Sequence, residues 1–309
     1  MYEQIASNER KSALIVLGAL VFTGGLGYLF GLIIGGGSFG AAITGLAIAL
    51  LLSAALSYWS YAHGDQLVLR TSRARAVSHD EEPRLHNVVE GLAIAAGLPK
   101  PAVYIVPERA PNAFATGRDP EHSSIAVTQG LLDTMNRVEL EGVIGHEMSH
   151  VRDRDILLGT IVATLVGAVV LIAEFMLRWF WWGGMFGGGR SRGGDGEGAQ
   201  GFALLAALGL VLALITPFFA QIIKLAMSRR REYLADVEGV KLTRYPPGLA
   251  SALRKIAADP TPMRVANNAT AHLWLNQPSR IHGEDNHWFE NLFSTHPPIQ
   301  DRIRRLEEM

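Results

Sequence analysis

The chain has 309 residues, and its 28 Lys and Arg against 29 Asp and Glu give a formal net charge of −1, which excludes a protein whose main role is to wrap nucleic acid. Hydrophobic residues make up 49% and charged residues 18% of the chain, so there is enough apolar surface to exclude disorder of the whole chain. The absence of Cys excludes disulfide scaffolds, thiolate zinc sites and Cys nucleophiles, and a metal site would have to use His, Asp and Glu.

The first long apolar run extends from Ser12 to Ala62 and contains no Asp, Glu, Lys or Arg. Because a spanning helix needs about 20 apolar residues, this run is long enough for two, and the sequence GGGS at 35–38 is typical of a turn between them. We therefore predict a transmembrane hairpin over residues 1–62. Gly27, Gly31 and Gly35 form a small-xxx-small stripe, which indicates close helix packing within the bundle or, alternatively, a dimer interface.

Two later apolar runs, 156–173 and 199–223, predict a third and a fourth span and hence a second hairpin over 156–223. A buried helix of a soluble domain is the alternative for the third run. The Gly-rich segment 183–201 joins these two runs, and its role stays open. Lys and Arg gather on one side of the predicted spans, for example at Arg10, Lys11, Arg70 and Arg73. This asymmetry places both termini and the polar segments 63–155 and 224–309 in the cytoplasm.

The two polar segments have the pattern of one folded domain. A helix is expected over 83–97, with Pro at its start and Gly at its end. Runs of β-branched and aromatic residues predict strands over 102–106, 113–116 and 124–128. Further helices are expected over 138–153, over most of 228–258 and over 297–309. The pattern predicts a mostly helical α+β domain with a small sheet, whose first part is 63–155 and whose second part is 224–309.

The sequence HEMSH at 146–150 carries the sharpest chemical signal. His146 and His150 are four residues apart, so they lie on one helix face and could share one Zn²⁺ ion. Glu147 is rotated away from this pair but can reach a water molecule at the metal as a general base. A catalytic zinc site needs a third protein ligand, which without Cys is a carboxylate or His.

Glu232 and Asp236 offer such carboxylates, four residues apart in the sequence EYLAD. Glu232 would coordinate the metal, and Asp236 would accept the remaining N–H of a ligand His and fix its tautomer. The spacing alone leaves open that both belong to an ordinary acidic helix surface beside the basic run at 229–231. In the same way, 113–116 could be an ordinary edge strand rather than a peptide-binding one, and His296 could cap the last helix.

Four motifs occur in the order found in one family, and the match spans nearly the whole chain. On these motifs the chain resembles the HtpX-type membrane metalloproteases, which are relatives of the eukaryotic CAAX prenyl proteases. The motifs are PNAFATG at 111–117, HEMSH at 146–150, EYLAD at 232–236 and STHPP at 294–298. The resemblance implies a zincin-like (gluzincin) α+β catalytic domain fused to a four-helix transmembrane bundle, with one Zn²⁺ per chain.

The resemblance also implies roles for particular residues. The zinc ligands would be His146, His150 and Glu232, the base would be Glu147, and Asp236 would support a ligand. Residues Asn112, Ala113 and Phe114 would lie on the edge strand that pairs with the substrate backbone, and His296 with Arg302 would stabilise the oxyanion.

The implied activity is that of a zinc endopeptidase of the bacterial inner membrane. It would cut misfolded or damaged membrane proteins at the cytoplasmic face during heat shock and membrane-protein quality control, and self-cleavage is compatible with this activity. The alternatives are a CAAX-type processing protease, which would need a deep cavity for a lipidated tail, and a non-catalytic zinc-holding membrane scaffold, against which the intact Glu147 argues.

Overall fold

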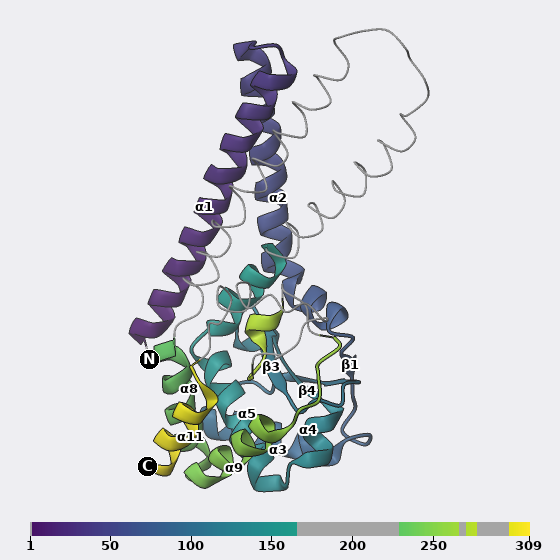
Figure 1. Cartoon of the computed structure of the whole chain (residues 1–309), viewed down its shortest axis with the longest axis vertical. Helices are drawn as coiled ribbons and strands as arrows, with labels where there is room; N and C mark the ends of the chain where they lie inside the picture. The colour runs from purple at the N-terminus through teal and green to yellow at the C-terminus, as the bar shows by residue number, and fades with distance from the viewer. Residues whose placement is uncertain (1, 166–228, 266–269, 277–296) are drawn as a thin grey trace.

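Two helices of 33 residues form an antiparallel hairpin that extends away from the globular part (Figure 1). This arrangement comes from a computed structural model that describes residues 2–165, 229–265, 270–276 and 297–309. Helix α1 covers Tyr2–Ile34 and α2 covers Phe39–Thr71. The turn between them uses the left-handed conformation at Gly36 (φ 58°) and Gly37 (φ 86°), which glycine adopts without steric cost. The predicted turn is confirmed.

The hairpin presents its apolar side chains outward. Leu14 is 65% exposed, Val21 68% and Leu51 72%, and most of the large exposed hydrophobic side chains of the described residues lie on α1 and α2. Because an exposed apolar surface that covers two helices is unfavourable in water, the hairpin is suited to lipid. Two helices long and apolar enough to span a membrane are found among the described residues, over Ile5–Leu32 and Phe39–Thr71.

The second predicted hairpin is described only at its start, where Asp155–Leu165 is an apolar helix. Its Thr164 hydroxyl is hydrogen-bonded to Ser60 of α2. The rest of the third run, the Gly-rich segment 183–201 and the fourth run lie outside the described residues, so the four-helix bundle stays a prediction.

The glycine stripe of α1 lies against α2, as the packing interpretation predicts. A Cβ atom built on Gly31 would stand 2.3 Å from the carbonyl oxygen of Ala41, and one on Gly27 would stand 2.5 Å from that of Gly45. Such distances are too short for any side chain, so the two backbones touch because glycine is present.

Replacing Gly31 by Leu is therefore expected to force α1 and α2 apart and to destabilise the hairpin by roughly 3 kcal/mol, which corresponds to a fall of about 6 to 12 °C in the thermal midpoint. Gly25 provides a matched control in the same helix, because a Cβ atom there would meet nothing within 4 Å. The Gly25→Leu protein should unfold within about 2 °C of the wild type. Equal losses in both variants would show that helix propensity, and not packing, decides the result. The measurement is thermal unfolding of the purified full-length protein in detergent.

Four strands form a small mixed sheet in the order β1-β2-β4-β3. Strands β2 (Ala102–Val106) and β4 (Ser123–Thr128) are parallel, whereas β1 (Arg75–Ala76) and β3 (Ala113–Gly117) are antiparallel edge strands. The three predicted strands are confirmed to within one residue at each end, and the two-residue β1 is an addition. Strand β3 therefore has one edge paired with β4, and its other edge is not paired with a strand of this sheet.

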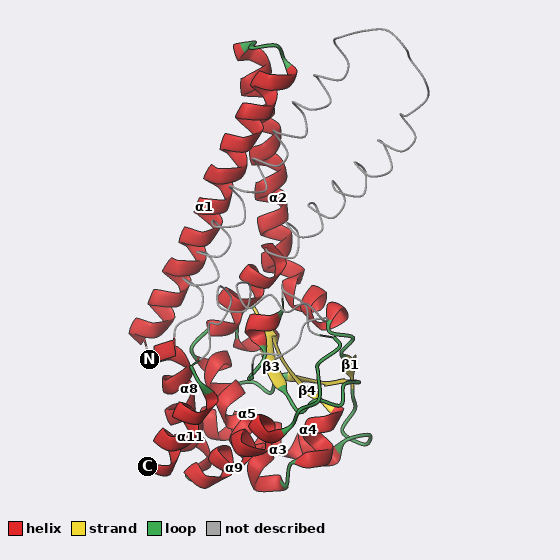
Figure 2. Cartoon of the chain, in the orientation of Figure 1, coloured by secondary structure: helices red, strands yellow, loops and turns green. Residues whose placement is uncertain are grey.

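Helices lie around this sheet (Figure 2), and apolar side chains of the helices and the strands form a buried core. The core joins side chains of α3, β4, α5 and α9, among them Leu85, Ile125, Ile144 and Leu253, all of which are fully buried. The predicted helix over 228–258 is two helices, because Arg244 adopts a left-handed conformation (φ 55°) immediately before the second one starts at Pro246. The remaining elements are α3 (Pro83–Ala96), η1 (Pro120–His122), α4 (Gln129–Thr134), α5 (Arg137–Arg152), α8 (Arg229–Thr243), α9 (Pro246–Ala258), η2 (Ala271–Leu273) and α11 (Ile299–Glu307).

Candidate metal centre and active site

Helix α5 carries the HEMSH sequence through the middle of the domain. Its start is fixed by a capping box, in which the Asn136 side chain accepts from the Glu139 backbone and the Glu139 carboxylate accepts from the Asn136 backbone. This reciprocal pairing satisfies two of the free N–H groups at the helix start. His146 and Glu147 lie in its buried second half, at 1% and 2% exposure.

A close crossing of α5 and α8 brings Glu232, the candidate for the third ligand, to the two histidines. A Cβ atom on Gly239 of α8 would stand 2.7 Å from the backbone nitrogen of His146, so only glycine permits this approach. Glu232 lies about two turns earlier on α8, and its carboxylate faces the two histidines of the HEMSH helix.

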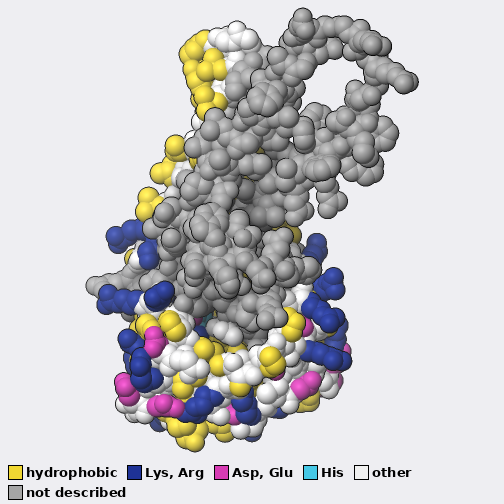
Figure 3. Space-filling model, viewed as in Figure 1, with side chains coloured by type: hydrophobic (Ala, Val, Ile, Leu, Met, Phe, Trp, Pro, Cys, Tyr) yellow, Lys and Arg dark blue, Asp and Glu magenta, His cyan; other side chains and the backbone are white. Residues whose placement is uncertain are grey.

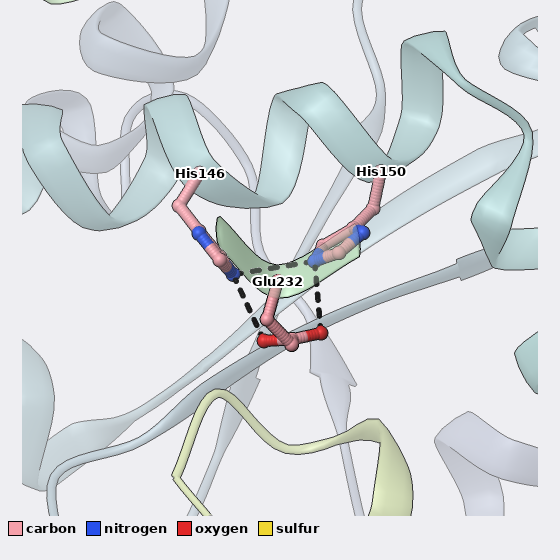
Figure 4. Close-up of side chains that lie close together, drawn as sticks. All are labelled: His146, His150 and Glu232. Carbon is pink, nitrogen blue, oxygen red and sulfur yellow. Dashed lines mark hydrogen bonds and ion pairs between the residues drawn. The ribbon is translucent and has the colours of Figure 1, made fainter. Parts of the chain in front are cut away.

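The side chains of His146, His150 and Glu232 point toward one another (Figure 4). One ligand atom of each lies within 4.8 Å of the others. Nε2 of His146 and Nε2 of His150 each stand 3.7 Å from an oxygen of Glu232, and the two nitrogens are 3.2 Å apart. The sequence prediction that these three residues share one place in the fold agrees with this geometry.

This donor set suits zinc. Two imidazole nitrogens and one carboxylate make up a common ligand set of catalytic zinc sites, which leaves a fourth position for water or substrate. In each histidine Nδ1 faces a carboxylate, so Nε2 is the nitrogen directed at the centre. Such carboxylate partners are the usual support of zinc-bound imidazoles.

His146 is supported by Asp236 and Arg302. Its Nδ1 lies 2.9 Å from Oδ1 of Asp236, and the guanidinium of Arg302 donates to both oxygens of that carboxylate, at 2.7 and 2.9 Å. Burial alone would raise the pKa of Asp236, but the charge of Arg302 and the hydrogen bond to His146 lower it to about 2. Arg302 is fully buried and also donates to the carbonyl oxygen of Leu275, so its guanidinium lies behind His146.

His150 is supported by Asp155, a residue that the sequence reasoning missed. Its Nδ1 lies 3.0 Å from Oδ2 of Asp155, and Nη1 of Arg231 donates to the other oxygen of this carboxylate at 2.9 Å. Burial alone lowers the pKa of His150, but the hydrogen bond with Asp155 and the charge of Glu232 outweigh it and raise the value to about 9. A charged residue just past a zinc helix and a basic residue beside Glu232 were the available signals.

Glu147 lies next to the three ligand candidates without belonging to them. Burial is the main cause that raises the pKa of its carboxyl to about 7, although the charge of His150 and a hydrogen bond from the backbone of Ala115 lower it. A carboxyl with a pKa near neutrality can both take up and release a proton at the working pH. The environment of Glu147 therefore suits the base predicted from the sequence.

A cleft beside the metal centre reaches the outer edge of β3. It is lined by Glu147, His150 and Glu232 together with Ala115 and Trp274. Backbone groups on this edge are the kind that bind an extended peptide by strand addition.

Part of that edge is occupied by the chain itself. The amide of Leu275 donates to the carbonyl oxygen of Ala113 at 2.9 Å, and Asn112 exchanges hydrogen bonds with the backbone of Asn276. The fully buried ring of Phe114 packs edge-on against Trp274. The predicted substrate residues Asn112, Ala113 and Phe114 are thus buried with residues 274–276 against them, whereas Ala115 of the same strand lines the cleft. His296, the other predicted oxyanion donor, lies outside the described residues.

The chain is similar to known proteins in sequence. Residues 79–309 match the profile of peptidase family M48. The protease HtpX homolog of Thermoanaerobacter pseudethanolicus is 43% identical over 310 residues, which cover 100% of this chain and 98% of that protein. The protease HtpX homolog of Lactobacillus acidophilus is 44% identical over 315 residues, which cover 100% of both chains. The crystal structure of S. mikatae Ste24p aligns with 99% of this chain and 67% of that chain at 17% identity, with a TM-score of 0.49.

Proposed function

Because the chain belongs to peptidase family M48 and is a zinc-dependent membrane protease of the HtpX type, we propose that it hydrolyses membrane proteins in loops or tails close to the cytoplasmic face of the membrane. Misfolded or damaged membrane proteins are the proposed substrates, in membrane-protein quality control and the stress response. The observation that carries this proposal is the short distance between the metal centre and the lipid-facing hairpin.

That distance follows from contacts at the start of α1. Asn8 hydrogen-bonds to Asp155, which in turn contacts His150. Leu14, whose side chain is 65% exposed, lies six residues further along α1, or about 9 Å at 1.5 Å per residue. The metal centre therefore lies close to the lipid. A peptide bond that is cut there could be connected to a membrane span by a short loop.

The proposed ligands of the zinc ion are His146, His150 and Glu232. When bound there, zinc supplies a Lewis acid that polarises the scissile carbonyl and acidifies water. Glu147 takes the proton from the attacking water and returns it to the leaving amine. Arg302 acts through Asp236, which fixes the ring of His146, and His296 is proposed as a donor to the developing oxyanion.

An extended substrate would bind by adding a strand to the outer edge of β3. Ala115 of this strand lines the cleft together with Glu147, which supports this binding mode. At Asn112 and Ala113 the substrate backbone would compete with residues 275 and 276 for the same hydrogen-bonding groups.

The proposed orientation has both termini and the catalytic domain in the cytoplasm of a bacterium, with the chain crossing the plasma (inner) membrane four times. The domain would be built from 63–155 and 224–309, and the two hairpins would be 1–62 and 156–223. Lys and Arg side chains gather on the globular part near its junction with the hairpin (Figure 3), whereas the visible hairpin surface is largely hydrophobic. This distribution supports a cytoplasmic domain, because basic residues flank spans on the cytoplasmic side.

Cleavage of one sequence in two settings tests the proposed substrate class. A cleavable segment is attached by a short linker to a transmembrane helix and reconstituted with the enzyme in liposomes, and the same segment is supplied as a soluble peptide at equal bulk concentration. The tethered form should be cut at least about 100-fold faster, because sharing one membrane raises the effective concentration at the centre. Dissolving the liposomes in detergent should lower the cleavage rate of the tethered form to that of the soluble peptide. Equal rates for both forms in liposomes would overturn the proposal and leave the protease itself intact.

A further inference from the structure

The first turns of α1 contact the globular part of the protein through Asn8. The side chain of Asn8 is buried, with the residue only 1% exposed, although it lies within the first candidate span. Its amide nitrogen donates to Oδ1 of Asp155 at 2.6 Å and to the carbonyl oxygen of Asp153 at 3.0 Å. Its amide oxygen accepts from Nη1 of Arg231 at 3.3 Å. The start of α1 lies beside α8, the helix that provides Arg231 (Figure 1).

Asp155 divides its two oxygens between the metal centre and α1. Oδ2 faces Nδ1 of His150 at 3.0 Å, whereas Oδ1 accepts from Asn8 and from Arg231. A carboxylate behind a ligand histidine fixes the tautomer and the ring orientation of that histidine. It can do so only if its own orientation is fixed, and here the donors on Oδ1 serve that purpose.

The two histidines differ in where this support comes from. The carboxylate behind His146 belongs to Asp236 of α8, and its guanidinium partner belongs to Arg302 of α11. The carboxylate and its guanidinium partner are thus both part of the catalytic domain. The carboxylate behind His150 receives one of its two donors from α1, a membrane helix. Among the described residues, α1 therefore contacts the carboxylate behind His150, whereas the carboxylate behind His146 is held by α11.

We propose that Asp155 and Asn8 are positioning residues for the zinc ligand His150, so that the first membrane helix forms part of the metal centre. Neither residue belongs to the three whose ligand atoms converge on the proposed zinc position. Asp155 acts through the His150 ring, and Asn8 acts through Asp155. This inference rests on the proposed zinc site, and its test uses metal binding without substrate, so that it can fail separately from the proposed substrate class.

The test measures zinc affinity of the full-length protein in detergent by chelator competition, and the absorption spectrum of the cobalt-substituted protein. Asp155→Asn should weaken zinc binding by about 10- to 100-fold, the usual effect of losing such a carboxylate. Asn8→Ala should weaken it by about 10-fold and shift the cobalt bands, because a reoriented imidazole changes the ligand field. The Glu9→Gln protein is the matched control. Glu9 is next to Asn8, is about half exposed and pairs with Arg154, so its loss should leave affinity and spectrum unchanged.

A double variant decides whether Asn8 acts through Asp155. If it does, the protein with both Asn8→Ala and Asp155→Asn should bind zinc no more weakly than Asp155→Asn alone, because interacting residues are not additive. Additive losses, or wild-type affinity and spectrum in Asn8→Ala, would overturn the role of Asn8. Should Asp155→Asn fail to fold, the affinity and spectrum of Asn8→Ala still decide the question. A wild-type chain without one zinc would overturn the site and this inference together.

Discussion

Replacing Glu147 by Gln is expected to lower kcat for peptide hydrolysis by about 10²- to 10⁴-fold, the range that a general base contributes, while the protein keeps its zinc. Gln has the shape of Glu, and its amide oxygen can still accept from the backbone of Ala115, which contacts the carboxylate in the wild type. Glu147 is not among the three residues whose ligand atoms converge. The change therefore removes the proton acceptor and leaves the metal ligands in place.

The measurement combines single-turnover cleavage of a membrane-tethered reporter with the zinc content of each preparation. Glu141→Gln is the matched control, because Glu141 lies on the same helix and pairs with Arg137 near the surface. That variant should cut at the wild-type rate. If Glu147→Gln cuts as fast as the control with equal zinc, the base is another group and the proposed chemistry is wrong at this point.

Replacing Arg302 by Leu should destabilise the catalytic domain by about 3–5 kcal/mol, because it leaves the buried carboxylate of Asp236 without its cationic partner. Asp236 is 3% exposed, and two of its hydrogen bonds come from this guanidinium. The carbonyl oxygen of Leu275 also loses a donor. A loss of this size is a large fraction of the 5–15 kcal/mol that typically stabilises a domain.

Thermal and denaturant unfolding of the full-length protein checks this result. Arg304→Leu on the same helix is the control, since the Arg304 side chain is 68% exposed and pairs with Asp301 three residues earlier. Its effect should stay within about 0.5 kcal/mol. A stable Arg302→Leu protein with strongly reduced kcat would instead favour the oxyanion role that the family resemblance implies for Arg302, and would contradict a role through Asp236.

Much of the fold could be predicted because local patterns decide it. The apolar run with GGGS at its centre forms the hairpin, and the three β-branched runs form β2, β3 and β4. The strand order could not be predicted, because it depends on long-range pairing of β2 with β4 past β3. The division between α8 and α9 was also missed. Arg244 ends the first helix in a left-handed conformation, and this conformation cannot be predicted from an Arg in the sequence.

The metal centre divides in the same way. His146, Glu147 and His150 follow from helical spacing. A third ligand is also required, but the spacing of Glu232 and Asp236 leaves an ordinary acidic helix surface open, and Glu232 is singled out only by the family resemblance. Asp155 was missed because its approach to His150 depends on the turn after α5, where Arg154 adopts a left-handed conformation (φ 58°) just before the helix that starts at Asp155. Asn8 was missed because its contact crosses 147 positions of the chain, and a single amide at the start of an apolar run carries no pattern.

The residues that meet around the metal centre extend along the chain from Asn8 to Arg302. A ribosome that adds 5–20 residues per second needs about 15 to 60 s to synthesise this stretch. Until α11 has emerged, Asp236 lacks the guanidinium that holds it, and the support of His146 is incomplete. The buried pairing of Asp236 with Arg302 therefore forms only after α11 has been synthesised, long after the apolar hairpin at the start of the chain.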